Sequence, residues 1–205
     1  MRLDGPLGGR GPYRYGYFPS VRVLALADRP PPIDPAVMAT QARVDAVLCL
    51  GDLDRAWIGS LATLRGIPRL GVHGNHDPPG LLTEIEVEDL QLRRTSVGGL
   101  TFCGFEGCVR YARGAPHQYT QRQGIRMARR LPAADVLLTH CPPIGINDDP
   151  EDPAHIGWEG LRTWVDEHRP RYLLHGHTHP IGGNVVTVYG DTRVYWISGA
   201  RILNL

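Results

Sequence analysis

The chain of 205 residues contains no lysine, so all 22 of its basic residues are arginine. A composition bias of the genome explains this absence better than a functional requirement does. Because 21 acidic residues nearly balance the arginines, the formal net charge is only +1. This balance argues against a polyanion-binding surface as the main role of the protein, while leaving room for a local basic patch.

Cysteine is scarce, and its four positions do not form a CxxC pair. Cys49 lies inside an apolar run, Cys103 and Cys108 flank a glycine-containing turn, and Cys141 directly follows a histidine. Cysteines in such positions are more often small buried hydrophobic residues than disulfide partners or zinc ligands. We therefore expect reduced thiols.

Long apolar runs are also missing, since none approaches the length of a membrane span. Residues 1–20 are rich in glycine, arginine and tyrosine and lack the apolar centre of a signal peptide. These features predict a cytoplasmic protein without a membrane partner. The length fits a single domain over residues 1–205, with an N-terminal arm over 1–20 and a catalytic α/β core over 21–205.

Short runs rich in valine and leucine predict strands that are buried on both faces. They lie at about residues 21–27, 46–50, 67–72, 135–139 and 172–175. Predicted helices alternate with them at about residues 34–43, from Asp54 onward, at 118–130 and at 158–168. Short strands over 85–105 and a hairpin of 184–189 with 192–197 complete the pattern. The order predicts an α/β domain with parallel strands, built on one mixed sheet or two packed sheets.

A polar cluster follows each of the five predicted strands. The clusters are Asp28, Gly51-Asp52, Gly74-Asn75-His76-Asp77, His140 and Gly176-His177-Thr178-His179. The carboxyl ends of strands in an α/β sheet collect catalytic groups from distant parts of a chain. Carboxylate and carboxamide oxygens together with imidazole nitrogens suit Mn²⁺, Fe or Zn²⁺, and an aspartate can bridge two such ions. The pattern therefore predicts metal-assisted chemistry.

This ordered set of motifs resembles the calcineurin-like metallophosphoesterase superfamily, in particular its small bacterial members. The resemblance covers about residues 21–179, and Gly-Asn-His-Asp with Gly-His-Thr-His is specific when both occur in this order. It implies the calcineurin-like phosphoesterase fold, in which two mixed β-sheets pack as a sandwich flanked by helices. It also implies two divalent metal ions, of manganese, iron or zinc, and a phosphate-ester substrate.

The resemblance further assigns a role to each motif residue. The implied metal ligands are Asp28 and His179 at the first position, Asp52 between both positions, and Asn75, His140 and His177 at the second. His76 would act as the catalytic histidine, which stabilises phosphoryl oxygens beside the bridging water and protonates the leaving group. Asp77 would orient His76 or cap the following turn.

The first motif departs from the family pattern. The family has Asp-x-His, but this chain has Asp28-Arg29-Pro30, so the first metal position lacks an imidazole. We expect a weaker or differently selective first site, for which His117 and His155 are unassigned candidate ligands. The second motif also has Arg55 where the family often has an acidic residue.

Three functions remain open on the sequence. The preferred one is hydrolysis of phosphomonoesters or phosphodiesters by a metal-activated water at an asymmetric dinuclear site. The alternatives are a non-catalytic scaffold built on the same fold and a metal-dependent nuclease, which would require the arginines of the 118–130 helix to face the site. Substrate-binding residues cannot be assigned, because the loops that would carry them have no recognisable motif. The sequence does not define the oligomeric state either.

Overall fold

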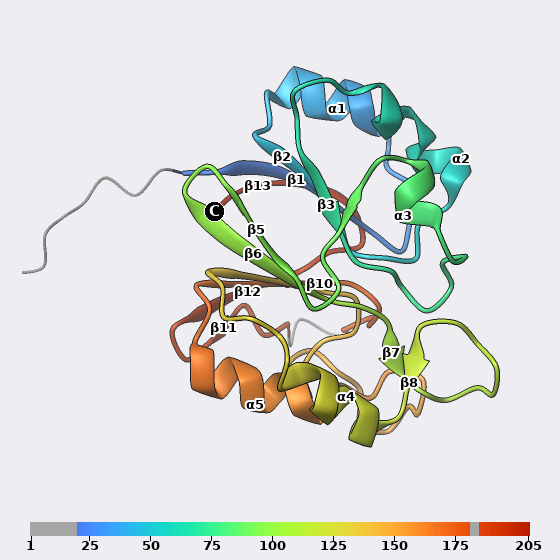
Figure 1. Cartoon of the computed structure of the whole chain (residues 1–205), viewed down its shortest axis with the longest axis vertical. Coiled ribbons are helices and arrows are strands. Elements are labelled where there is room, and N and C mark those ends of the chain that lie inside the picture. The colour runs from blue at the N-terminus through green and yellow to red at the C-terminus, as the bar shows by residue number, and fades with distance from the viewer. Residues whose placement is uncertain (1–19, 181–184) are drawn as a thin grey trace, which may run out of the picture.

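A computed structural model describes residues 20–180 and 185–205, which form two β-sheets packed face to face between two layers of helices (Figure 1). The arm predicted over residues 1–20 lies outside this range except for Ser20, as does Asn184 of the predicted hairpin. The described part confirms the predicted architecture of two mixed sheets flanked by helices.

The first sheet has five strands in the order β13-β1-β2-β3-β4. Strands β1 (Arg22–Ala27), β2 (Ala46–Cys49), β3 (Arg69–Gly71) and β4 (Glu88–Asp89) run parallel, and β13 (Gly199–Asn204) pairs antiparallel with β1. In β1 every residue after Arg22 is buried, as expected for a strand covered on both faces.

The second sheet has six strands in the order β11-β12-β10-β9-β6-β5. Its parallel centre consists of β12 (Thr192–Trp196), β10 (Tyr172–His175), β9 (Val136–Thr139) and β6 (Leu100–Phe105). The two edge strands, β11 (Val188–Tyr189) and β5 (Arg94–Val97), are antiparallel to their neighbours. A separate parallel pair joins β7 (Cys108–Val109) to β8 (Gln118–Tyr119).

Helices cover the outer face of each sheet (Figure 1). The five-stranded sheet carries α1 (Pro35–Ala42), α2 (Arg55–Ile58), a 3₁₀ turn (Gly59–Thr63) and α3 (Leu81–Glu84), and the six-stranded sheet carries α4 (Gln121–Ala128) and α5 (Glu159–His168). Between the sheets, buried side chains such as Leu48, Phe102 and Leu174 form the central core. None of the helices in the described residues is long and apolar enough to cross a membrane.

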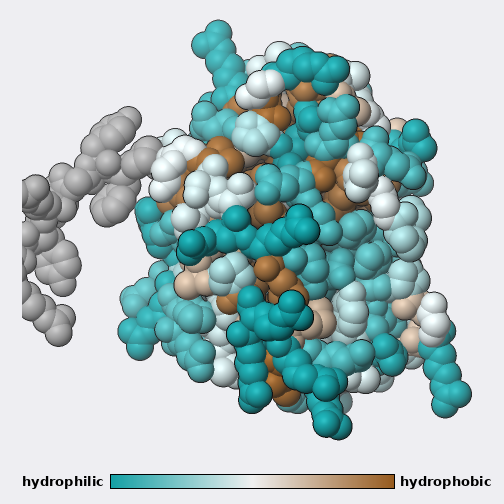
Figure 2. All heavy atoms as spheres, viewed as in Figure 1, coloured by the Kyte–Doolittle hydropathy of each residue, from teal (hydrophilic) through white to brown (hydrophobic). Residues whose placement is uncertain are grey.

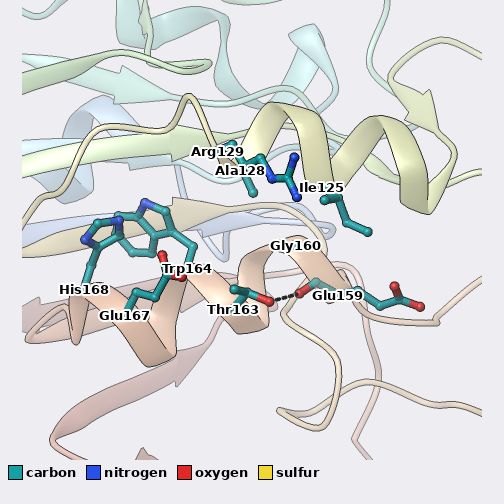
Figure 3. Close-up of a pocket in the computed structure, with 9 residues that line it drawn as sticks. All are labelled: Ile125, Ala128, Arg129, Glu159, Gly160, Thr163, Trp164, Glu167 and His168. Carbon is teal, nitrogen blue, oxygen red and sulfur yellow. Dashed lines mark hydrogen bonds between the residues drawn. The ribbon is translucent and has the colours of Figure 1, made fainter.

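The two helices on the six-stranded sheet approach closely because each contributes a glycine. A Cβ atom at Gly124 would lie 2.5 Å from the buried ring of Trp158, and one at Gly160 would lie 2.9 Å from the Cα of Ile125. Figure 3 shows the shallow pocket that remains between α4 and α5, where the Thr163 hydroxyl donates to the carbonyl of Glu159.

Several predicted element boundaries are wrong. The helix that starts after Asp54 leaves α-helical geometry at Gly59, a residue with poor helix propensity, and continues as a 3₁₀ turn. The helix predicted from residue 118 begins at Gln121, because Gln118–Tyr119 pair with β7 and Thr120 forms a capping box with Gln123. Strand β13 was not predicted.

Candidate metal centre

Backbone hydrogen bonds bring the five polar clusters together at the carboxyl ends of strands from both sheets. Within the first sheet, the N–H of Asp28 donates to the carbonyl of Gly51 over 3.3 Å. Within the second sheet, the N–H of Gly176 donates to the carbonyl of His140 over 3.0 Å. The two sheets are joined by His140, whose Nδ1 lies 2.8 Å from the carbonyl of Leu50.

Left-handed backbone conformations turn three of the predicted ligands out of their strands. Asp28, Asp52 and His177 have φ angles of 61°, 54° and 65°. Such conformations cost on the order of 1–3 kcal/mol for residues other than glycine, and they concentrate at functional sites. In each case a strand ends and the side chain is presented at the sheet edge.

Two glycines allow the second and third motifs to lie against each other. A Cβ atom at Gly51 would overlap the backbone of Gly74 and lie 2.8 Å from Nδ1 of His140. A Cβ atom at Gly74 would overlap the carboxylate of Asp52. Only glycine at both positions leaves space for the Asp52 carboxylate beside His140.

Donor atoms of Asp52, His140 and His177 lie within 4.8 Å of one another. The Nε2 atom of His140 is 3.4 Å from Oδ2 of Asp52 and 2.9 Å from Oδ1 of Asn75. Because Nδ1 of His140 faces a carbonyl and requires a proton there, Nε2 of the neutral ring is a lone-pair donor that faces two oxygens. A cation between these atoms would remove the repulsion between the Nε2 lone pair and the two oxygens. The donor set therefore fits Mn²⁺, Fe or Zn²⁺.

The pKa values of His140 and Asp52 reflect the same close approach of Nε2 to oxygen atoms. Burial alone would lower the pKa of His140, but the Asp52 carboxylate outweighs it and raises the pKa to about 9. Burial alone would likewise raise the pKa of Asp52, but His140 and the N–H of His76 lower it below the usual range. Positive charge is thus required at this point, and a proton on His140 supplies it when no cation does.

Burial disfavours the charged forms of two other predicted ligands. It raises the pKa of Asp28 to about 6, even though the charge of His140 and the N–H of His177 act in the opposite direction. Burial and repulsion by His140 lower the pKa of His177 to about 3. His177 therefore stays a neutral imidazole at neutral pH, the form that binds metals.

Asp77 positions the third motif through the backbone. Its carboxylate is buried and accepts hydrogen bonds from the N–H of Gly74 over 2.7 Å and from the N–H of Leu53 over 2.8 Å. Both partners precede Asp77 in the chain, so its carboxylate holds the turn of the third motif itself and does not cap the following turn. The N–H of His76 donates to Oδ1 of Asp52 over 2.8 Å, and the side chain of His76 is exposed.

The remaining predicted ligand, His179, is exposed and lies apart from the central group. Its ring centroid is 5.5 Å from that of His155, and the His155 ring is 5.1 Å from that of His177. His155 lies on the loop between β9 and α5 (residues 140–158, called here the rim loop). There the Asp152 carboxylate lies 2.6 Å from Nδ1 of His155. Of the two unassigned histidines, His155 thus lies beside His179, a predicted ligand of the first position.

The other unassigned histidine, His117, lies elsewhere. Its Nδ1 is 3.1 Å from Oε2 of Glu106, so the structure does not support it as a replacement for the missing first-motif histidine. In the same segment, the Arg110 guanidinium donates to the carbonyl of Gln118.

Tyr111 reaches the site, although the sequence offered no signal for it. Its hydroxyl accepts a hydrogen bond from the Asn75 amide over 3.1 Å, and its side chain is partly exposed. The contact joins residues 36 positions apart, so no local pattern could have revealed it. Tyr111 fixes the Asn75 amide with its oxygen directed at His140.

The rim loop after β9 is anchored by a buried histidine. Nε2 of His175 accepts a hydrogen bond from the Asn147 amide over 2.9 Å, and Nδ1 lies 3.0 Å from the carbonyl of Gly176. Burial lowers the pKa of His175 to about 4, so its ring is neutral. His175 is thus a core histidine with both nitrogens satisfied.

Residues 22–180 match the sequence model of the calcineurin-like phosphoesterases, and the chain belongs to this family. The fold is shared with TT1561 of Thermus thermophilus, whose crystal structure aligns with a TM-score of 0.58 at 14% identity, covering 90% of this chain and 99% of that chain. Another solved structure aligns with a TM-score of 0.61 at 18% identity, covering 90% and 95%. A search of curated protein sequences gives no significant match.

The geometry around Asp77 leads to a stability prediction. In Asp77→Asn, the amide offers one acceptor and turns a donor toward a second donor, so either Gly74 or Leu53 loses its partner. A buried polar group without a partner costs about 1–3 kcal/mol. Urea denaturation should show a loss of this size in the free energy of unfolding.

Asp54→Asn is the matched control, because Asp54 caps α2 at the surface and asparagine caps helices equally well. Its free energy of unfolding should stay within about 0.5 kcal/mol of the wild type. Equal losses in the two variants would show that Asp77 has no special role.

Proposed function

We propose that this protein hydrolyses phosphomonoesters or phosphodiesters at an asymmetric dinuclear metal site. The single observation that carries the proposal is the convergence of Asp52, His140 and His177, with Asn75, on one buried point. Membership of the calcineurin-like phosphoesterases supports the general class of reaction. When bound, divalent cations there would activate a water and neutralise phosphate oxygens.

In this proposal the two metal positions differ in strength. Asn75, His140 and His177 would hold the second ion, and Asp52 would serve both positions; the approach of Nε2 of His140 to the oxygens of Asp52 and Asn75 supports this. The first position would rely on Asp28 and the exposed His179, without the imidazole that Pro30 replaces. Because His179 is exposed whereas Asn75, His140 and His177 are buried, the first position would be the weaker site.

We assign His155 as the imidazole that completes the first position. The Asp152 carboxylate holds the proton on Nδ1, which leaves Nε2 as the lone-pair donor. A carboxylate behind a histidine in this way is the usual support for a metal ligand. The rings of His177 and His179 are the neighbours of His155 on the side of the site.

His76 is the proposed catalytic histidine. It lines an open cavity together with Asp28, Asp52 and Trp57, so its exposed imidazole can contact a phosphate ester that enters there. Its backbone is held by the carboxylate of Asp52. From this position the ring can donate a hydrogen bond to a phosphoryl oxygen and pass a proton to the leaving group.

Two features weigh against a purely scaffolding role. The catalytic His76 is retained, and large exposed hydrophobic residues in the described chain are few, namely Ile33, Val37, Tyr111 and Val188. Hydrophilic side chains dominate the face seen in Figure 2, where apolar residues form small separate patches. A docking scaffold would be expected to present a larger continuous apolar surface.

The nuclease alternative depended on the arginines of α4. Arg122, Arg126, Arg129 and Arg130 lie on or directly after α4, whose buried side packs on the outer face of the six-stranded sheet. None of the four lines the cavity that contains Asp52 and His76. This placement favours small phosphate esters as substrates over a nucleic acid, which would need a continuous basic surface beside the site.

A Mn²⁺-dependent screen over aryl phosphates, bis-aryl phosphates, cyclic nucleotides and nucleic acid tests the proposed function. With the best substrate, His76→Ala should lower kcat by about 10²–10⁴, the usual contribution of a general acid. His168→Ala on the distant α5 is the matched control and should keep wild-type activity. Equal trace activity in the wild type and His76→Ala would refute an enzymatic role.

The role of His155 is tested by metal dependence. In His155→Ala, the Mn²⁺ concentration that gives half-maximal activity should rise by at least about tenfold, while activity at saturating Mn²⁺ should largely recover. Asp152→Asn should produce a smaller shift in the same direction, because it removes only the support of the ring. An unchanged Mn²⁺ dependence in both variants would exclude His155 as a ligand.

A further inference from the structure

A second group of metal-binding side chains lies outside the candidate active site. It consists of His73, Glu106 and His117, called here the buried triad. His73 follows β3, Glu106 directly follows β6, and His117 directly precedes β8. Backbone hydrogen bonds from Gly107 to His73 and from Cys108 to His117 hold these three segments together.

The donor atoms of the triad have the spacing of a metal site. Oε2 of Glu106 lies 3.1 Å from Nδ1 of His117 and 3.4 Å from Nδ1 of His73. Zinc bonds of about 2.0–2.1 Å place ligand atoms about 3.3 Å apart in a tetrahedral site. All three donor atoms lie within 4.8 Å of one another.

The triad is buried, and three of the four ring nitrogens of its histidines lack a hydrogen-bond partner among the described residues. The side chains of His73, Glu106 and His117 are only 9%, 10% and 14% exposed. Both ring nitrogens of His73 and the Nε2 atom of His117 have no hydrogen-bond partner among the described residues. The approach of His73 to Glu106 is close enough for charge attraction but has no hydrogen-bond geometry. Buried polar atoms without partners are costly, and a cation bound by Nδ1 removes part of that cost.

Hydrogen bonds around Glu106 orient its carboxylate toward the two imidazoles. The hydroxyl of Tyr119 donates to Oε1 of Glu106, which leaves Oε2 directed at the histidines. The N–H of Glu106 is held by the side chain of Gln91 over 2.8 Å. Such hydrogen bonds behind a carboxylate are typical of metal ligands. Asp89 has a carboxylate oxygen 4.0 Å from Nδ1 of His73 and provides a fourth donor within reach.

We propose that the buried triad binds one divalent cation of the zinc type, as a structural site separate from the candidate active site. Two imidazole nitrogens and one carboxylate oxygen, with Asp89 or water as the fourth donor, match the ligands that zinc accepts. The His73 and His117 rings are stacked at 4.5 Å and nearly parallel, at 3°. Binding therefore requires one ring to turn about its Cβ–Cγ bond so that both Nδ1 lone pairs meet the ion.

Such an ion would hold two segments of the chain in a fixed position relative to each other. It would tie the β7–β8 segment, which carries Tyr111, to the turn that carries Asn75 and His76. Loss of the ion would loosen Tyr111 without removing any predicted ligand of the active site. The proposal does not depend on phosphoesterase activity, because it concerns residues that the active site does not use.

Zinc counting in an active-site knockout tests the proposal. The full-length Asp52→Asn/His177→Ala double variant is loaded with Zn²⁺, desalted and analysed by mass spectrometry for metal content. It should retain one zinc per chain. Adding Glu106→Gln or His117→Ala should remove that zinc, whereas Glu159→Gln, at the exposed start of α5, should not. Circular dichroism checks that each variant is folded.

Cobalt provides an independent readout in the same variants. Co²⁺ bound in a four-coordinate site absorbs strongly in the visible range, so the double variant should become coloured and the added His117→Ala should abolish the absorption. Absence of retained zinc in the double variant, or equal retention after Glu106→Gln and His117→Ala, would overturn the proposal. Because the active site is already disabled, neither result bears on the proposed hydrolase function.

Discussion

The candidate metal centre depends on the position of one buried imidazole. His140 directly follows β9 of the six-stranded sheet, yet its Nδ1 is satisfied by the carbonyl of Leu50, which directly follows β2 of the five-stranded sheet. This contact fixes the direction of Nε2, and together with the hydrogen bond from the N–H of His177 to the Asp28 carboxylate it joins the edges of the two sheets. Because Nε2 then faces oxygens of Asp52 and Asn75, the protein carries a built-in requirement for positive charge at that point.

The rest of the site depends on bringing distant segments of the chain close to Nε2 of His140. Glycines at 51 and 74 let the second and third motifs approach, and the Asp77 carboxylate holds the third motif against the loop after Asp52. The left-handed conformation of Asp52 adds strain that packing elsewhere must offset. Stability and site geometry are therefore coupled in this fold.

Sequence reasoning succeeded where a local pattern carries the information. Short valine- and leucine-rich runs predicted the strands of the parallel core, and the family resemblance carried by the motifs implied the sandwich of two sheets. It failed where contacts join distant residues. The pairing of β13 with β1, the Tyr111–Asn75 bond and the meeting of His73 with His117 have no local signature. For the same reason, the sequence could not show that His117, a candidate ligand of the first position, lies beside Glu106.

Anomalous diffraction from crystals of the Mn²⁺-loaded protein is the most direct test of the account. The proposed dinuclear site predicts a strong manganese peak within about 2.0–2.3 Å of donor atoms from Asp52, Asn75, His140 and His177. It also predicts a weaker peak near Asp28 and His179. A map without a peak beside Nε2 of His140, with the Asn75 and Asp52 contacts to that ring unchanged, would contradict it.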